Sequence, residues 1–135
     1  MNKLFWLIAF AAAMTLFGCG PSRPPTYTVS GTVTFEGTPV ADGDILFESE
    51  ENPALRAEGG KITAGKYSVK VNPGKNKISI RASKPNPDKK GMMGEPIPED
   101  YIPEHYNNAS ILHETIAPNN ENRFDFALKE KLEKK

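Results

Sequence analysis

Short runs in which apolar and polar residues alternate, separated by glycine and proline, constrain the fold of this chain more than any other feature. Within residues 28–35, the apolar side chains of Val29, Val33 and Phe35 fall on one face, while serine and threonines fall on the other. Alternation with this enrichment in β-branched residues is typical of a strand that is buried on one side. The 12 prolines scattered through the 135 residues argue against long helices. We therefore predict an all-β fold.

The same pattern recurs at short intervals along the chain. The clearest turn lies at residues 72–75, because Pro73 and Gly74 supply the φ angles that a type II turn requires. The other runs that we predict as strands are residues 44–48, 61–63, 66–71, 76–81, 112–116 and 124–128. Together they predict one β-sandwich domain of about seven short strands over residues 28–129.

Residues 1–18 have the pattern of a secretory signal peptide. Lys3 gives a short positive start, and residues 4–17 form an almost unbroken apolar run. The run is shorter than the roughly 20 residues of a membrane-spanning helix, but it suits the core of a signal peptide. It ends in Leu-Phe-Gly-Cys, which resembles the lipobox of bacterial lipoproteins. The resemblance implies that cleavage falls between Gly18 and Cys19 and that Cys19 receives a diacylglyceryl lipid. An uncleaved N-terminal membrane anchor with an incidental cysteine is the alternative.

Cys19 is the only cysteine in the chain, so an exported domain has no internal disulfide, and lipidation accounts for the odd thiol. We expect a Pro-rich tether over residues 19–27 and a charged C-terminal tail over residues 130–135. The expected location is the bacterial cell envelope, with the domain anchored to a membrane and facing the periplasm or the cell surface. Removal of Lys3 with the signal changes the formal net charge from zero to −1. Because the chain has no basic stripe, we expect no binding to nucleic acid.

A long Pro-rich loop is predicted over residues 82–108, which hold five prolines. We expect its first half to be loose and its second half to pack along the sandwich, since long connections are usually functional or mobile. Tyr101, His105 and Tyr106 form the best candidate for a recognition surface, because aromatic rings with polar tips stack on sugars or anchor partner proteins. The alternative is that these side chains only pin the loop to the sandwich.

A family resemblance adds to this prediction. It rests on four segments: Val-Ser-Gly-Thr-Val-Thr-Phe-Glu-Gly-Thr-Pro-Val-Ala-Asp-Gly (29–43), Gly-Lys-Tyr-Ser-Val-Lys-Val-Asn-Pro-Gly-Lys (65–75), Ile-Pro-Glu-His-Tyr-Asn-Asn-Ala-Ser (102–110) and Phe-Asp-Phe-Ala-Leu (124–128). The chain resembles bacterial lipoproteins that carry a carboxypeptidase-regulatory-like, or transthyretin-like, domain. The resemblance implies an antiparallel Greek-key β-sandwich, but fold alone does not establish an activity. A relative with known chemistry, the transthyretin-like hydroxyisourate hydrolase, ends in Tyr-Arg-Gly-Ser, which is missing here.

The titratable residues do not form a recognisable catalytic or metal-binding motif. His105 and His113, with Glu104 and Glu114 beside them, lack the ligand spacing of a metal site. A triad of Ser110, His113 and Asp125 can be drawn, but no Gly-x-Ser-x-Gly elbow supports it.

Two further patterns have ordinary explanations. Asp42, Asp44 and Glu48 lack the later ligands of an EF-hand calcium loop, so turn chemistry accounts for them. The sequon at Asn108 is taken as coincidence in a bacterial lipoprotein. We therefore expect no cofactor and no enzyme activity, and predict a structural or protein-binding module with an unknown envelope protein or glycan as partner. The alternative is a carbohydrate- or small-ligand-binding lipoprotein that uses residues 95–110, and a hydrolase ranks third.

Overall fold

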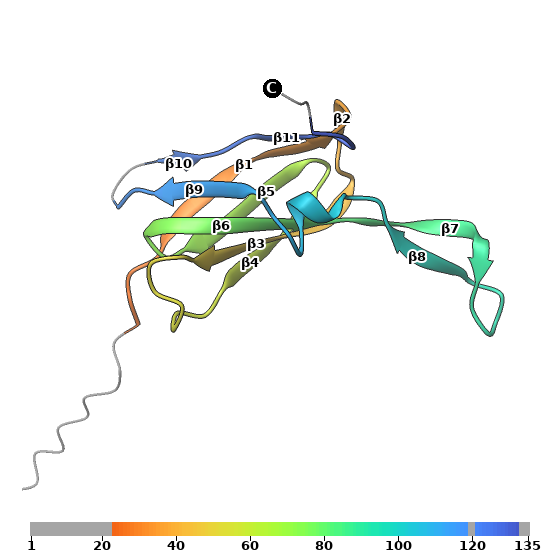
Figure 1. Cartoon of the computed structure of the whole chain (residues 1–135), viewed down its shortest axis with the longest axis horizontal. Helices are drawn as coiled ribbons and strands as arrows, with labels where there is room; N and C mark the ends of the chain where they lie inside the picture. Colours follow the sequence, from red (N-terminus) through yellow and green to blue (C-terminus); the bar gives the residue numbers. More distant parts are fainter. Residues whose placement is uncertain (1–22, 119–120, 133–135) are drawn as a thin grey trace, which may run out of the picture.

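The structure, a computed structural model, describes residues 23–118 and 121–132. These residues form an all-β fold, which confirms the all-β part of the prediction (Figure 1). The elements in chain order are β1 (Tyr27–Phe35), β2 (Thr38–Pro39), β3 (Asp42–Ser49), β4 (Glu58–Thr63), β5 (Lys66–Val71), β6 (Gly74–Arg81), β7 (Ser83–Lys90), β8 (Pro96–Asp100), the 3-10 turn η1 (Glu104–Tyr106), β9 (Leu112–Ile116), β10 (Asn122–Arg123) and β11 (Phe126–Leu128).

The main sheet is one continuous, curled path of seven strands. Its order is β10-β1-β5-β4-β3-β6-β9, with β2 and β11 also paired to β1. The path curls into a half-barrel, so that β1 lies across from β6 (Figure 1). The two edges approach one another between β9 and β10, where the side chain of Asn122 accepts a hydrogen bond from Ala117 N at 2.9 Å and donates one to Ala117 O at 3.0 Å.

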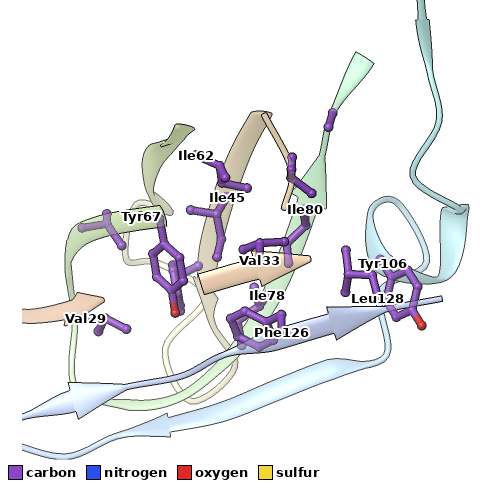
Figure 2. Packing of buried hydrophobic residues seen from close by; sticks show 14 of the residues in the cluster. Val29, Val33, Ile45, Ile62, Tyr67, Ile78, Ile80, Tyr106, Phe126 and Leu128 are labelled. Atoms are coloured by element: carbon purple, nitrogen blue, oxygen red, sulfur yellow. The ribbon is translucent and has the colours of Figure 1, made fainter. Parts of the chain in front are cut away.

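The alternating runs place their apolar faces as predicted. Val29 and Val33 of β1 are fully buried, and so are Ile45 and Phe47 of β3 and Ile78 and Ile80 of β6. The core fills the inside of the curled sheet (Figure 2). Its buried members are Val29, Val33, Val40, Ile45, Phe47, Ile62, Tyr67, Val69, Val71, Ile78, Ile80, Ala82, Ile102, Tyr106, Ile116, Phe126 and Leu128. The whole cluster therefore lies between residues 29 and 128.

The chain bends at Pro73, inside the predicted turn at residues 72–75, and Gly74 and Lys75 already belong to β6. Gly74 has a φ of +99°, which favours glycine. The buried side chain of Asn76 fixes this turn by donating to Asn72 O at 3.2 Å and Gly74 O at 2.9 Å. The turn carries the chain from β5, which pairs with β1 and β4, to β6, which pairs with β3 and β9.

The C-terminal strands depart from the predicted antiparallel pairing, because β10 and β11 both run parallel to β1. Between them, Phe124 and Asp125 cross over Gly31. Phe124 N donates to Ser30 O at 3.0 Å, and Asp125 Oδ1 accepts from Thr32 N at 2.8 Å and from Thr32 Oγ1 at 2.9 Å. We call these contacts between residues 30–32 and 124–125 the C-terminal clasp.

The predicted loop over residues 82–108 is not one continuous loop. Its first half is an ordered hairpin, in which β7 and β8 pair with each other and not with the main sheet. Prolines are tolerated there because both strands of a two-stranded sheet are edge strands. Its second half packs as predicted, since Ile102 and Tyr106 are buried in the core.

The clasp makes folding sensitive to pH. Side-chain and backbone hydrogen bonds from Thr32 lower the pKa of Asp125 from its ordinary value of 3.8, and Arg123 lowers it further, although desolvation raises it. A carboxyl group whose pKa is lower in the folded state stabilises the fold above its unfolded pKa, and this stabilisation is lost as the pH falls through the folded pKa. We therefore expect the thermal midpoint of wild type to exceed that of Asp125→Asn at neutral pH, with the difference shrinking below about pH 4. A difference that stays constant from neutral to acid pH would contradict this role, and Asp88→Asn on β7 serves as the control.

Candidate functional site

The predicted lipidation site lies outside the described residues, and so do Gly18 and most of the proposed tether. The described part of the chain contains no helix that is long and apolar enough to cross a membrane. The candidate sites that can be built from side chains therefore come from residues 23–118 and 121–132.

The structure places Tyr106 in the core and not on the surface. Its ring lies beside Leu128 (Figure 2), and its hydroxyl accepts a hydrogen bond from Lys129 N at 3.1 Å. His105, the residue before it on η1, packs its ring against Tyr106 with 4.2 Å between ring centroids. The buried Nε2 atom of His105 has no hydrogen-bond partner within the described part of the chain. These rings therefore hold η1 against the sheet.

Tyr101, the third predicted recognition residue, is half-buried. It meets the ring of Phe35 edge to face with 5.6 Å between centroids, and the ammonium group of Lys84 lies 5.6 Å from its own centroid. Burial raises the pKa of the Tyr101 hydroxyl, and the nearby charge of Asp42 raises it further. His105 and Tyr106 thus contact each other, whereas Tyr101 packs against Phe35 and Lys84, and the three residues do not form an exposed aromatic platform.

The triad residues considered from the sequence are not brought together. Ser110 Oγ donates a hydrogen bond to Ile78 O, and His113 Nδ1 lies 3.0 Å from a carboxylate oxygen of Glu50. Asp125 belongs to the C-terminal clasp described above. Each side chain is therefore held by a different element.

Two of the three acidic residues considered for calcium, Asp44 and Glu48, are paired with lysines. Asp44 lies 2.7 Å from Lys61 Nζ, and Glu48 lies 3.2 Å from Lys77 Nζ. Among the described residues, no group of three or more histidine, cysteine, aspartate or glutamate side chains is placed to hold a metal ion.

The most unusual surface feature is the tip of the β7–β8 hairpin. Met92 and Met93 have relative exposures of 105% and 94%, the highest of the large exposed apolar residues. Sequence analysis did not select them as site residues, although glycines on both sides of two adjacent methionines are a turn signal. Exposed methionines are common on surfaces that bind partners, because the thioether side chain is flexible and polarizable.

The tip is ordered by its own hydrogen bonds. Gly91 N donates to Glu95 O at 2.9 Å, and Gly94 N donates to Gly91 O at 3.1 Å. Met93 N donates to the carboxylate of Glu95 at 3.0 Å. Gly94 has a φ of +86°, which a residue with a side chain rarely adopts. The turn therefore presents both methionines without relying on contacts to the main sheet.

The hairpin also has a distinctive place in the molecule. β1 starts near one end of the longest axis, and the β7–β8 hairpin forms the opposite end (Figure 1). The chain enters the domain through β1 at Tyr27. The methionine tip thus points away from the end at which the N-terminal segment joins the domain.

Comparison with known proteins identifies no family. No protein-family model matches the chain, and no curated protein matches it. Among solved structures, it is similar to part of a 9R-lipoxygenase from Cyanothece PCC8801, with 11% identity and a TM-score of 0.38. That alignment covers 80% of this chain and 17% of the lipoxygenase.

Proposed function

We propose that this chain is a lipid-anchored bacterial envelope protein whose domain is a non-enzymatic protein-binding module. The lipid on Cys19 holds it to a membrane, and the β7–β8 hairpin contacts the partner protein. The observation that carries the proposal is the ordered hairpin tip with two almost fully exposed methionines. Burying such side chains in an apolar pocket is favourable by about 25 cal/mol per Å² of apolar surface. Because the turn is already ordered, little backbone conformational entropy is lost on binding.

The position of the tip supports a protein partner over the anchoring bilayer. A lipid at Cys19 would be connected to the domain at its Tyr27 end, whereas the hairpin projects from the opposite end. The charge of the hairpin also favours a protein partner over the bilayer. Its basic residues are Lys84, Lys89 and Lys90, and its acidic residues are Asp88, Glu95, Glu99 and Asp100, so three positive and four negative charges leave −1. A net negative segment is not attracted to anionic lipid.

We further propose that the curled sheet is a transthyretin-like, carboxypeptidase-regulatory-like Greek-key sandwich. The support is the order of strands along the main sheet and the burial of the same face in β1, β3, β5 and β6. Such a domain serves here as a rigid support for the hairpin.

Carbohydrate binding through residues 95–110 is the weaker alternative. Stacking on a sugar needs exposed ring faces. Tyr106 is 6% exposed, and Tyr101 packs against Phe35 and Lys84. The packing of these rings favours the protein-binding module.

Replacing Cys19 tests the anchor. We expect wild-type cells grown with labelled palmitate to yield a labelled protein in the membrane fraction, whereas Cys19→Ser yields an unlabelled protein that is released from that fraction. The reason is that the thioether to the diacylglyceryl group needs the only thiol in the chain. Ser22→Ala, three residues further along, is the matched control and keeps the label. Membrane retention of Cys19→Ser together with an unlabelled wild type would overturn the proposed anchor.

A further inference from the structure

A depression on the outer face of the main sheet is the second surface feature that the packing of the core does not explain. It lies across β3, β4 and β6, has a volume of about 650 Å³ and is bordered by Asn107 and Asn108, which follow η1. This volume is within the range of volumes that are typical of binding sites for small organic molecules. We call it the outer groove.

The floor of the outer groove is apolar. Leu46 occupies an outward position of β3, where alternation normally places a polar residue, and it is 37% exposed. Its neighbours in register are Gly59 on β4 and Ser79 on β6. A Cβ atom added at Gly59 would lie 3.2 Å from Leu46 Cδ1. The absence of a side chain at Gly59 therefore keeps the space beside Leu46 open.

The rim of the outer groove is charged at both ends. At one end, Asp44 lies in register between Lys61 and Arg81, and its carboxylate is 2.7 Å from Lys61 Nζ. At the other end, Lys77 and Glu48 neutralise each other at 3.2 Å. The first end thus has two cations and one anion, and it is net positive.

Arg81 is the group that is available to an incoming anion. The hydrogen-bond partner that the structure gives its guanidinium is the neutral side-chain oxygen of Asn108. No carboxylate lies within ion-pair distance of Arg81 in the described part of the chain. A guanidinium has five N–H donors and matches a carboxylate with two parallel hydrogen bonds. Asn108 thus holds the guanidinium in place while most of its donors remain unused.

We propose that the outer groove binds a small amphiphilic carboxylate. The carboxylate pairs with Arg81, and the apolar body of the molecule lies over Leu46 in the space left by Gly59. Asp44 repels the anion, but Lys61 neutralises its charge, so the net field at this end favours a negative group. The groove and the hairpin tip share no residues, so this proposal does not depend on the hairpin.

Titration with sodium octanoate, followed by backbone amide NMR, tests the site. The domain from residue 20 to residue 135 is suitable because it contains every residue of the core cluster. We expect saturable shifts centred on Leu46, Gly59 and Arg81. Arg81→Gln and the neutral probe octanamide should each weaken binding at least about fivefold, because each removes one charge of the pair. Leu46→Ser should weaken both probes alike, since it removes apolar contact.

Lys66→Gln, an exposed cation on β5, is the matched control and should bind octanoate as wild type does. Because Arg81 and Lys66 are both exposed, we expect both variants to fold. Well-dispersed amide resonances in their spectra verify this. Shifts that do not saturate would overturn the proposed site, and so would equal octanoate affinity in wild type and a folded Arg81→Gln. The double variant Met92→Ser, Met93→Ser should leave octanoate binding unchanged, which separates the failure of this site from the failure of the hairpin proposal.

Discussion

Replacing Tyr67 with alanine is expected to lower the free energy of unfolding by about 3 to 5 kcal/mol, the range for removing a buried aromatic ring. Tyr67 is 4% exposed, and its ring lies between those of Phe47 and Phe126, with centroid distances of 6.3 Å and 6.2 Å. Its hydroxyl donates a hydrogen bond of 2.8 Å to Phe124 O, so the residue joins the core to the C-terminal clasp. Burial raises the pKa of this hydroxyl, and Asp125 and Glu114 raise it further, which keeps it a donor.

Tyr67→Phe separates the ring from the hydroxyl. We expect this variant to lose about 1 to 2 kcal/mol, because it removes one hydrogen bond and leaves a carbonyl without that partner. Chemical denaturation of wild type and both variants measures the two losses. If Tyr67→Ala lost less than about 1 kcal/mol, the assignment of this ring to the core would be wrong.

Replacing Gly31 with alanine is the second change with a large expected effect. A Cβ atom at this position would lie 1.8 Å from the carbonyl oxygen of Phe124, which is a main-chain atom. The clash cannot be relieved by a side-chain rotation, so β1 and the segment between β10 and β11 must separate. We expect a loss of about 3 kcal/mol or more, at the upper end for overpacking.

Hydrogen exchange locates this damage. The amides of β11 should exchange faster in Gly31→Ala than in wild type, because β11 is held by β1. Gly59→Ala is the matched control, since its added Cβ meets its nearest neighbours at 3.2 Å and one of these is the end of the Leu46 side chain. Equal stability of Gly31→Ala and wild type would show that the clasp does not close over Gly31.

Local sequence patterns were sufficient to predict β1, β3, β5, β6 and β9 of the main sheet, but not the two-residue strands β2 and β10. The alternation of Val29 and Val33 in β1, and of Tyr67, Val69 and Val71 in β5, identified the buried faces correctly. These predictions succeed because a strand buried on one side has to alternate. The turn at residues 72–75 was predictable for a similar reason, since its φ angles need proline and glycine.

The C-terminal clasp could not be predicted, because it joins residues about 93 positions apart. Parallel pairing of β10 and β11 with β1 depends on the path of the whole sheet and leaves no local pattern. A signal was nevertheless present at Gly31. A lone glycine inside a strand often marks a close approach of another backbone, and here that backbone is Phe124.

The hairpin was missed because its prolines indicated a loop. Pro85 of β7 lies opposite Pro98 of β8, a pairing that a central strand would not tolerate. The residues predicted as a recognition surface are not the exposed residues of the structure. Tyr106 was selected for its ring, but it is buried in the core together with Ile102, four residues before it. The exposure of Met92 could not be inferred from its residue type, since methionine is as common in cores as on binding surfaces.

Photo-crosslinking in intact cells tests most directly whether the anchored domain contacts a protein through its hairpin. A photo-reactive amino acid is placed at position 92 in one strain and at position 70 in another, since Lys70 is an exposed residue of β5 on the main sheet. We predict a discrete protein adduct from position 92 that is absent from position 70 and is lost when Met93 is also changed to serine. Adducts of equal yield from both positions, or reaction of position 92 with lipid alone, would contradict the proposed function.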